Sequence, residues 1–238
     1  KGSALGWFWT ILTPLLMLAV YMFVFSVVFQ RRWETAIGDK GNFALFLFSG
    51  LICHGFLAEL LSRAPGLIAE KRNYVKRIMF PLEVIPIVAV AAAGFTLLVN
   101  LAILLLMYVI SIGLPPPTIL FFPIVLAPLA IFGAGIAYLF SAVGVFMRDL
   151  RHASQILVLL FLFLTPIFYP LESVPEAYRS WTLINPLAAI VHELRGILFF
   201  ARPPALSTML PLWVGTTAFA LVARAFFMRL REVFADAV

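Results

Sequence analysis

Charged side chains are scarce in this sequence. Only 12% of its 238 residues are Asp, Glu, Lys or Arg, whereas 63% are hydrophobic. Soluble domains usually carry about 25% charged and about 45–50% apolar residues, so this composition excludes an ordinary soluble protein. We therefore expect a chain that crosses a membrane several times.

Residues that build covalent or metal cross-links are also few. Cys53 is the single cysteine, which excludes a disulfide within the chain and leaves the redox compartment open. His54, His152 and His192 fall on different predicted elements and lack the spacing of metal ligands. No metal site is expected.

Two signatures of energy supply are missing. A phosphate-binding loop needs Gly-Lys followed by Ser or Thr, but the lysines after the first are preceded by Asp39, Glu70 and Val75. Proton-driven carriers keep ionisable residues inside their spans. Here Glu59 and Glu83 lie near the ends of apolar segments. We expect no cofactor in this chain, no enzymatic activity of its own, and a source of energy outside the chain.

Long apolar runs dominate instead. A span needs about 20 mostly apolar residues. No charged residue occurs from Val84 to Met147, and Gly113 followed by Pro115–Pro117 predicts a turn that divides this run in two. Six spans are predicted, at about residues 5–29, 43–62, 83–112, 118–147, 153–170 and 205–228.

The segment at about residues 172–202 predicts a helical hairpin between spans five and six. Ser173 to Glu176 is typical of a capping box, and Asn185-Pro186 of a second helix start. That second helix has about 14 residues, roughly 21 Å, and the hydrocarbon core is about 30 Å thick. We therefore interpret the hairpin as re-entrant, with Glu193 and Arg195 off its apolar stripe.

The distribution of positive charge favours six spans over seven. Cytoplasmic loops of membrane proteins are enriched in Lys and Arg. With six spans and both termini cytoplasmic, 11 of the 17 Lys and Arg residues lie inside. These are Lys1, Arg63, Lys71, Arg72, Lys76, Arg77, Arg148, Arg151, Arg224, Arg229 and Arg231. The expected fold is one all-α polytopic membrane domain over residues 1–238, and the abrupt apolar start suggests a preceding segment.

A basic segment separates spans two and three. Four Lys and Arg residues fall within residues 71–77, and apolar residues such as Leu67, Tyr74 and Ile78 share one face. The pattern predicts an amphipathic helix at about residues 66–79 on the cytoplasmic side. Taken alone, it fits either a loop that binds anionic lipid or a docking element for a soluble partner.

Aromatic residues, 15% of the chain, crowd spans one and five. They fit packing and interfacial belts, and they also fit the lining of a transport path. The candidates for such a path are Trp7, Trp9, Tyr21, Phe25, Phe161 and Phe168.

Several short motifs in order point to a family. They are Leu5-Gly6-Trp7-Phe8-Trp9 with Pro14-Leu15 and Val20-Tyr21, Asn73-Tyr74-Val75-Lys76 with Phe80-Pro81-Leu82-Glu83, Arg148-Asp149-Leu150, Thr165-Pro166-Ile167-Phe168-Tyr169-Pro170, and Asn185-Pro186-Leu187 with Glu193-Leu194-Arg195. Together they run almost the whole length of the chain. The sequence resembles the membrane subunit of type-2 ABC exporters that export polysaccharides such as O-antigen.

This resemblance implies how the protein works. It implies a homodimer in the bacterial inner membrane that pairs with two copies of an ATPase, which binds ATP and Mg, and that exports a lipid-linked polysaccharide. The segment between spans two and three would be the coupling helix that docks on the ATPase. The candidate coupling residues are Glu70, Lys71, Arg72, Tyr74, Lys76, Arg77, Arg148 and Asp149, and the hairpin carries Asn185, Pro186, Glu193 and Arg195. Spans one and five would line the channel.

Other classes stay open at this stage. Capsule, teichoic-acid, lipid or drug exporters of the same superfamily share the plan. A secondary flippase would need charge inside the spans. A polytopic glycosyltransferase would need acids gathered at one face, and Glu34, Asp39, Glu172 and Glu176 are scattered. Nucleic-acid binding is not expected, because the basic residues form short clusters between apolar runs.

Overall fold

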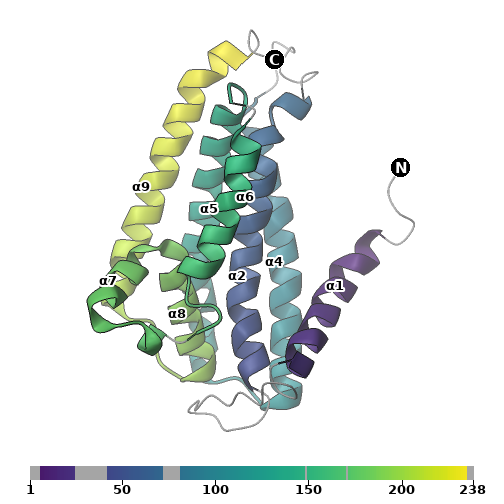
Figure 1. Cartoon of the computed structure of the whole chain (residues 1–238), viewed down its shortest axis with the longest axis vertical. Helices are drawn as coiled ribbons and strands as arrows, with labels where there is room; N and C mark the ends of the chain where they lie inside the picture. The colour runs from purple at the N-terminus through teal and green to yellow at the C-terminus, as the bar shows by residue number, and fades with distance from the viewer. Residues whose placement is uncertain (1–5, 25–41, 72–80, 148, 170, 235–238) are drawn as a thin grey trace.

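The computed structural model describes residues 6–24, 42–71, 81–147, 149–169 and 171–234 (Figure 1). Every regular element in these ranges is helical. The α-helices are α1 (Gly6–Tyr21), α2 (Asn42–Arg63), α4 (Val84–Ser111), α5 (Phe122–Gly144), α6 (Leu150–Leu164), α7 (Glu176–Ile184), α8 (Pro186–Phe199) and α9 (Leu206–Leu230). Short 3-10 helices are η2 (Ala64–Gly66), η3 (Ala69–Lys71), η4 (Pro117–Phe121), η5 (Leu171–Ser173) and η6 (Arg231–Val233).

Four helical segments of the described chain are long and apolar enough to cross a membrane. They are residues 43–66, 84–111, 117–144 and 206–233, which contain α2, α4, α5 and α9. The helices α7 and α8 would add a fifth crossing if they counted as one span, but they are bent by 103° to one another. Within the described residues α1 and α6 are shorter, with 16 and 15 residues. The all-helical fold is confirmed, whereas the count of six spans stays a prediction.

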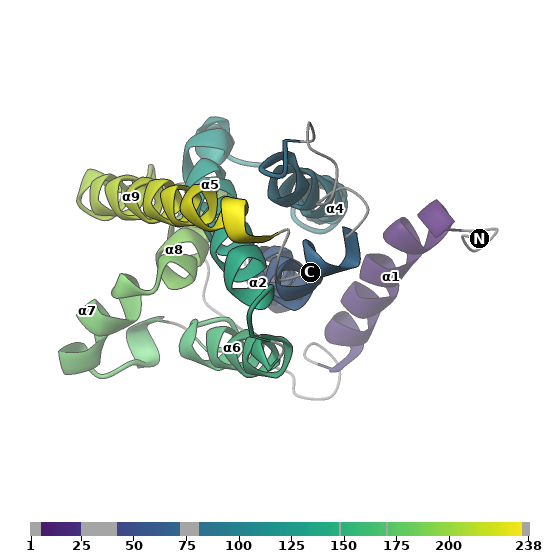
Figure 2. The ribbon, with the colours of Figure 1, turned by 90° about the horizontal axis from the view of Figure 1, so that it is seen from above.

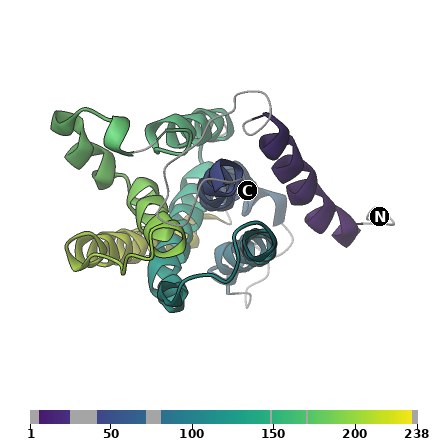
Figure 3. The same cartoon turned by 90° about the horizontal axis from the view of Figure 1, so that it is seen from below.

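Helix α2 forms the centre of the bundle. In its apolar window 78% of residues are buried, against 22–33% in the other three long segments. Views from the two ends show α2 enclosed by α4, α5, α6 and α8, with α1 at the periphery (Figures 2 and 3). A helix enclosed on all sides must be apolar all round, and the run from Phe43 to Gly50 is buried without a break.

Small residues let the long helices approach closely. The most extensive helix pair is α5 with α9, where Gly135 faces the ring of Phe219 and the backbone of Ala220. On another face of α5, Gly133 lies against the ring of Phe56 on α2. Interfaces of this kind gain van der Waals contact, which drives helix association in lipid.

Proline and glycine set the helix ends. Gly113 has a φ of 121°, which is accessible to glycine, and together with the prolines that follow it makes the expected turn between α4 and η4. Helix α6 ends at Leu164, before the predicted end at about residue 170. Thr165 is extended because the ring of the following Pro166 disfavours the helical conformation.

Several connections gather at one end of the molecule, which we name the C-terminal end of the bundle. The end of α2, the start of α4, the junction of α5 and α6, and the end of α9 all lie there (Figure 1). The turn between α4 and α5 and the junction of α8 and α9 lie at the opposite end. This arrangement places α6 and the connection from α2 to α4 side by side.

Candidate functional site

The connection from α2 to α4 contains the predicted coupling helix. Its described part, residues 64–71, forms the two short turns η2 and η3 and not the start of an α-helix. Residues 72–80 lie outside the described part of the chain. Of the coupling candidates, Glu70, Lys71 and Asp149 are described. The other five candidates lie outside the described part of the chain: Arg72, Tyr74, Lys76, Arg77 and Arg148.

This connection is wedged against the end of α5. The backbone of Pro65 lies so close to Gly144 that a Cβ atom added to Gly144 would overlap the Pro65 carbonyl. The distance from this added Cβ to the Pro65 Cα would be only 2.6 Å. Glycine at position 144 therefore allows a backbone contact that no larger residue permits. The backbone of Pro65 is thus in direct contact with the end of α5.

The same connection is tied to the start of α6. Arg151 Nη2 donates to Glu70 Oε1 at 2.7 Å, and Gln155 Nε2 donates to Ser62 Oγ at 3.2 Å. Both Glu70 and Arg151 are more than half exposed, so this ion pair orients the two segments more than it stabilises them. Sequence reasoning did not select Arg151 as a coupling residue, because a pair of charges 81 positions apart leaves no local pattern.

The start of α4 is joined to the end of α9 at the same end of the bundle. Arg231 Nη1 lies 3.2 Å from Glu83 Oε2, and the Tyr138 hydroxyl donates to the Glu83 carbonyl at 3.3 Å. Asp149 sits exposed just before α6, and its side chain does not cap that helix. Of the described candidates, Glu70 therefore contacts α6 through Arg151, and Asp149 lies two positions before Arg151 in the chain.

Arg195 on α8 is a buried anchor. It is 4% exposed and donates to the carbonyl oxygens of Phe46 at 3.0 and 3.2 Å, Pro166 at 2.6 Å and Ile167 at 2.9 Å. Pro166 and Ile167 belong to the loop that follows α6, where no helix supplies partners for their carbonyls. Arg195 thereby satisfies backbone groups that would otherwise be orphaned in a membrane.

Glu193 is buried as well, at 1% exposure. Its Oε2 accepts from the backbone N–H of Ala205 at 3.2 Å and lies 3.9 Å from Arg202 Nη2. The same Arg202 nitrogen is 2.9 Å from His192 Nε2. This cluster closes the connection between α8 and α9.

Glu193 and Arg195 lie off the apolar stripe of their helix, and this pattern alone does not predict that they are buried. In the structure α8 contacts α2, α5, α7 and α9, and both side chains are buried. At its start, the expected cap is present, with Asn185 Oδ1 accepting from Leu187 N at 3.0 Å and Pro186 in the first helical position. The capping box expected from Ser173 is not formed, because α7 begins after Pro175 and no side chain caps it.

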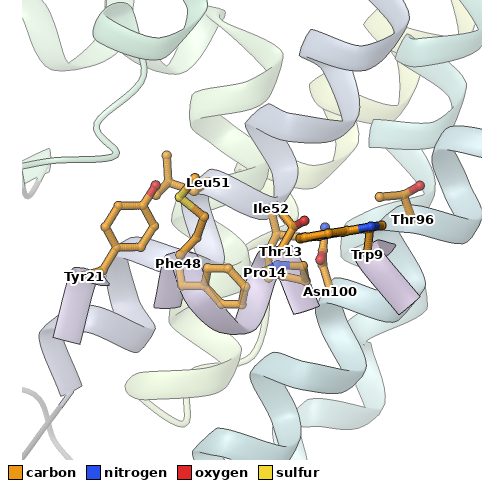
Figure 4. Close-up of a pocket in the computed structure, with 10 residues that line it drawn as sticks. Trp9, Thr13, Pro14, Tyr21, Phe48, Leu51, Ile52, Thr96 and Asn100 are labelled. Carbon is orange, nitrogen blue, oxygen red and sulfur yellow. The ribbon is translucent and has the colours of Figure 1, made fainter. Parts of the chain in front are cut away.

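The aromatic path candidates separate into two groups. Trp9 and Tyr21 line a pocket of about 460 Å³ between α1, α2 and α4 (Figure 4). Phe161 instead packs against Phe132 on α5, with 6.3 Å between ring centroids, and Phe168 lies 6.3 Å from Phe163. The side chain of Trp7 and the whole of Phe25 lie outside the described residues. The described candidates are therefore not brought together in one pocket of this chain.

The sequence is similar to a known family of membrane proteins and to several of its named members. The model of the ABC-2 type transporter family matches residues 1–199. The chain is 27% identical over 240 residues to the O-antigen export system permease protein RfbA of Myxococcus xanthus, covering 100% of this chain and 90% of that protein.

Two further relatives come from other bacteria. A protein of the same name from Klebsiella pneumoniae is 26% identical over 200 residues, which are 83% of this chain and 74% of that protein. The polysialic acid transport protein KpsM of Escherichia coli is 29% identical over 190 residues, 79% of this chain and 71% of that protein. With the family match extending over most of its length, the chain belongs to the ABC-2 type transporter family.

Proposed function

We propose that this chain is the transmembrane subunit of an ATP-driven exporter that moves a lipid-linked polysaccharide, of the O-antigen kind, across the bacterial inner membrane. The observation that carries the proposal is the family match over residues 1–199 together with relatives named for O-antigen and polysialic acid transport. A homodimer that binds two copies of a separate ATPase completes the transporter. ATP and Mg bind to that ATPase and not to this chain.

The contacts at the C-terminal end of the bundle support a route for the work of ATP hydrolysis. The ATPase docks on the basic segment that continues from Lys71. Its motion displaces the α2–α4 connection, which is in contact with α5 through Gly144 and with α6 through Arg151. Helix α6 then moves relative to α2, which opens the path for the polymer.

A six-span topology with both termini in the cytoplasm fits the placement of charge. Arg63, Lys71, Arg151, Arg229 and Arg231 all belong to segments at the C-terminal end of the bundle, which becomes the cytoplasmic face. Helices α1 and α6 serve as short spans, and α7 with α8 form the re-entrant hairpin. Arg195 holds that hairpin against α2.

Gene deletion and complementation, with an active or an inactive ATPase subunit, test the proposed function. Deleting the gene in the parent bacterium should leave the polymer inside the cell, and this chain together with its ATPase should restore surface polymer. An ATPase subunit without hydrolytic activity should fail to restore it. Surface polymer that persists after deletion, or restoration with the inactive ATPase, would contradict the proposal.

Docking is tested by charge reversal. Changing Lys71, Arg72, Lys76 and Arg77 to Glu should abolish export and lower recovery of the ATPase with the tagged permease. The matched control reverses Arg224 and Arg229, two exposed cations on α9 near the same end of the bundle. Normal copurification and export by the first variant would show that docking lies elsewhere.

Topology is tested with single cysteines in a Cys53→Ala background, since Cys53 is buried and free. Glu176→Cys on α7 and Ala201→Cys after α8 should both react with a membrane-impermeant thiol reagent added outside. Glu232→Cys in η6 should react after permeabilisation only. If α7 and α8 formed one bent span, positions 176 and 201 would label from opposite sides.

A capsule-type polymer is the second candidate cargo, because KpsM is named for polysialic acid transport. The deletion strain separates the two. Loss of surface polymer attached to lipopolysaccharide identifies an O-antigen, whereas loss of a separate acidic capsule with intact lipopolysaccharide identifies a capsular polymer.

A further inference from the structure

The pocket between α1, α2 and α4 has polar groups within an otherwise apolar lining (Figure 4). Trp9 and Thr13 come from α1, Thr96 and Asn100 from α4, and Phe48 from α2. Asn100 lies near the middle of α4, so in the proposed topology it lies near the centre of the bilayer. Polar side chains at that depth are costly and are typically retained for function.

Asn100 carries an unsatisfied acceptor. Its Oδ1 atom is buried and has no hydrogen-bond partner among the described residues. A buried acceptor without a donor costs about 1–3 kcal/mol, so such groups are normally paired with protein, water or ligand. Asn100 also lines the pocket, so a rotation of its amide that turns Oδ1 toward the pocket lets that oxygen accept a hydrogen bond from a molecule bound there.

The other lining groups match one kind of ligand. The indole of Trp9, half exposed and labelled in the close-up beside Asn100, presents a flat aromatic face and an N–H donor. Thr13 supplies a hydroxyl, while the Thr96 hydroxyl is directed to the Ala92 carbonyl at 3.4 Å. A sugar ring has one apolar C–H face that stacks on aromatics and hydroxyl groups around its edge. An acyl or isoprenoid chain would have no use for the amide, because it carries no donor.

We propose that this pocket is a contact site for a sugar unit of the exported polymer, with Trp9 stacking on the ring and Asn100 Oδ1 accepting from a hydroxyl. The inference rests on the proposed function and deepens it. It extends the polymer path to α4, a helix that sequence reasoning did not assign to it. The volume of about 460 Å³ lies in the usual range for small-molecule pockets, which is large enough for a monosaccharide unit.

The test is photo-cross-linking in living cells that carry the complete transporter. The photoreactive residue p-benzoylphenylalanine replaces Thr96, which lines the pocket, or Leu98, which is 65% exposed two positions further along α4. Cells that make the polymer are compared with cells that lack its first glycosyltransferase. After irradiation, the tagged permease is separated on a gel and probed for glycan.

A glycan adduct at position 96, only in cells that make polymer and at least several-fold above position 98, is the expected result. Adding Asn100→Leu should weaken that adduct. Equal adducts at both positions, or a glycan adduct that persists without polymer, would overturn the inference, the latter because the adduct would not come from the exported polymer.

A second measurement avoids dependence on the bulky probe. Asn100→Leu should lower the export rate about fivefold at unchanged protein abundance, as expected for one lost hydrogen bond, and Asn100→Gln should restore part of it. Unchanged export by Asn100→Leu would overturn the pocket assignment while the function stands. Failure of the unaltered chain with its ATPase to export any polymer would instead overturn the proposed function.

Discussion

The guanidinium of Arg195 on α8 lies over the ring of Phe46 on α2, with its central carbon 3.8 Å from the ring centroid. The carbonyl of Phe46 also accepts hydrogen bonds from Nε and Nη2 of the same arginine. Arg195 thus contacts both the aromatic ring and the backbone carbonyl of Phe46 on the central helix α2. Because Arg195 also reaches Pro166 and Ile167, it fixes the loop after α6 and the hairpin in one position.

Removing this anchor should destabilise the fold. Arg195→Met keeps much of the side-chain volume but removes the donors to the buried carbonyls of Pro166 and Ile167. The Phe46 carbonyl loses two hydrogen bonds and keeps the one from the Ser49 hydroxyl. We expect a loss of about 3 kcal/mol in free energy of unfolding. Arg195→Lys should recover little, since an ammonium lacks the planar fork that reaches all three. Thermal denaturation of the purified protein in detergent, with Arg179→Met as the control on α7, measures the effect. Equal melting temperatures for Arg195→Met and the control would contradict the anchor role.

Gly144 should be intolerant of a side chain. Gly144→Ala places a Cβ in the space occupied by the Pro65 backbone, and overpacking of this kind typically costs about 1–3 kcal/mol. We expect export to fall more than ATP hydrolysis, because the α2–α4 connection is pushed away from α5. Gly94→Ala on α4 is the matched control, since nothing lies within 4 Å of an added Cβ there. If both variants export alike, the contact does not transmit motion.

The Glu70–Arg151 pair should matter for coupling and hardly at all for stability. Exposed pairs contribute about 0–1 kcal/mol, so Glu70→Arg and Arg151→Glu should each leave the melting temperature almost unchanged. Each should reduce the amount of polymer exported per ATP hydrolysed, because like charges then separate α6 from the connection. Combining both changes restores opposite charges and should recover coupling. Additive losses in the double variant would show that the two residues act independently.

The sequence predicted those structural features that a few neighbouring residues determine, and it did not predict those that depend on contacts between distant segments. The turn at Gly113 and the cap at Asn185 were predictable, because a few neighbouring residues determine each one. The burial of Glu193 and Arg195 was not, since it depends on four helices that enclose α8 and that are distant in sequence. The capping box predicted at Ser173 is not formed, because α7 begins after Pro175 and Pro175 occupies the N-cap position.

The candidate site divides in the same way. Glu70 could be selected from a basic, amphipathic segment, whereas its partner Arg151 and the backbone contact of Gly144 exist only once α5 and α6 are folded against that segment. Asn100 was hidden inside the longest uncharged run of the chain. A single amide in an apolar helix has no periodic signature, and only its unpaired oxygen in the folded structure distinguishes it.

The aromatic candidates should differ in their effect on export. Trp9 and Tyr21 share the pocket with Asn100, whereas Phe161 packs against Phe132 on α5. Each aromatic contact contributes about 0.5–1.5 kcal/mol beyond its buried area, so losing one should slow a moving polymer without stopping it. Trp9→Ala and Tyr21→Ala should therefore lower the export rate in graded fashion, by about two- to tenfold each, at normal protein abundance.

Phe161→Ala should act differently, by lowering abundance, because it leaves a cavity beside Phe132. Phe95→Ala is the control for an aromatic residue outside the pocket, as Phe95 is 63% exposed on α4 and faces lipid in the proposed topology. Export rates in cells and permease levels in the same membranes separate the two effects. If Trp9→Ala reduces export only in proportion to its abundance, as a packing residue would, then Trp9 does not contact the polymer.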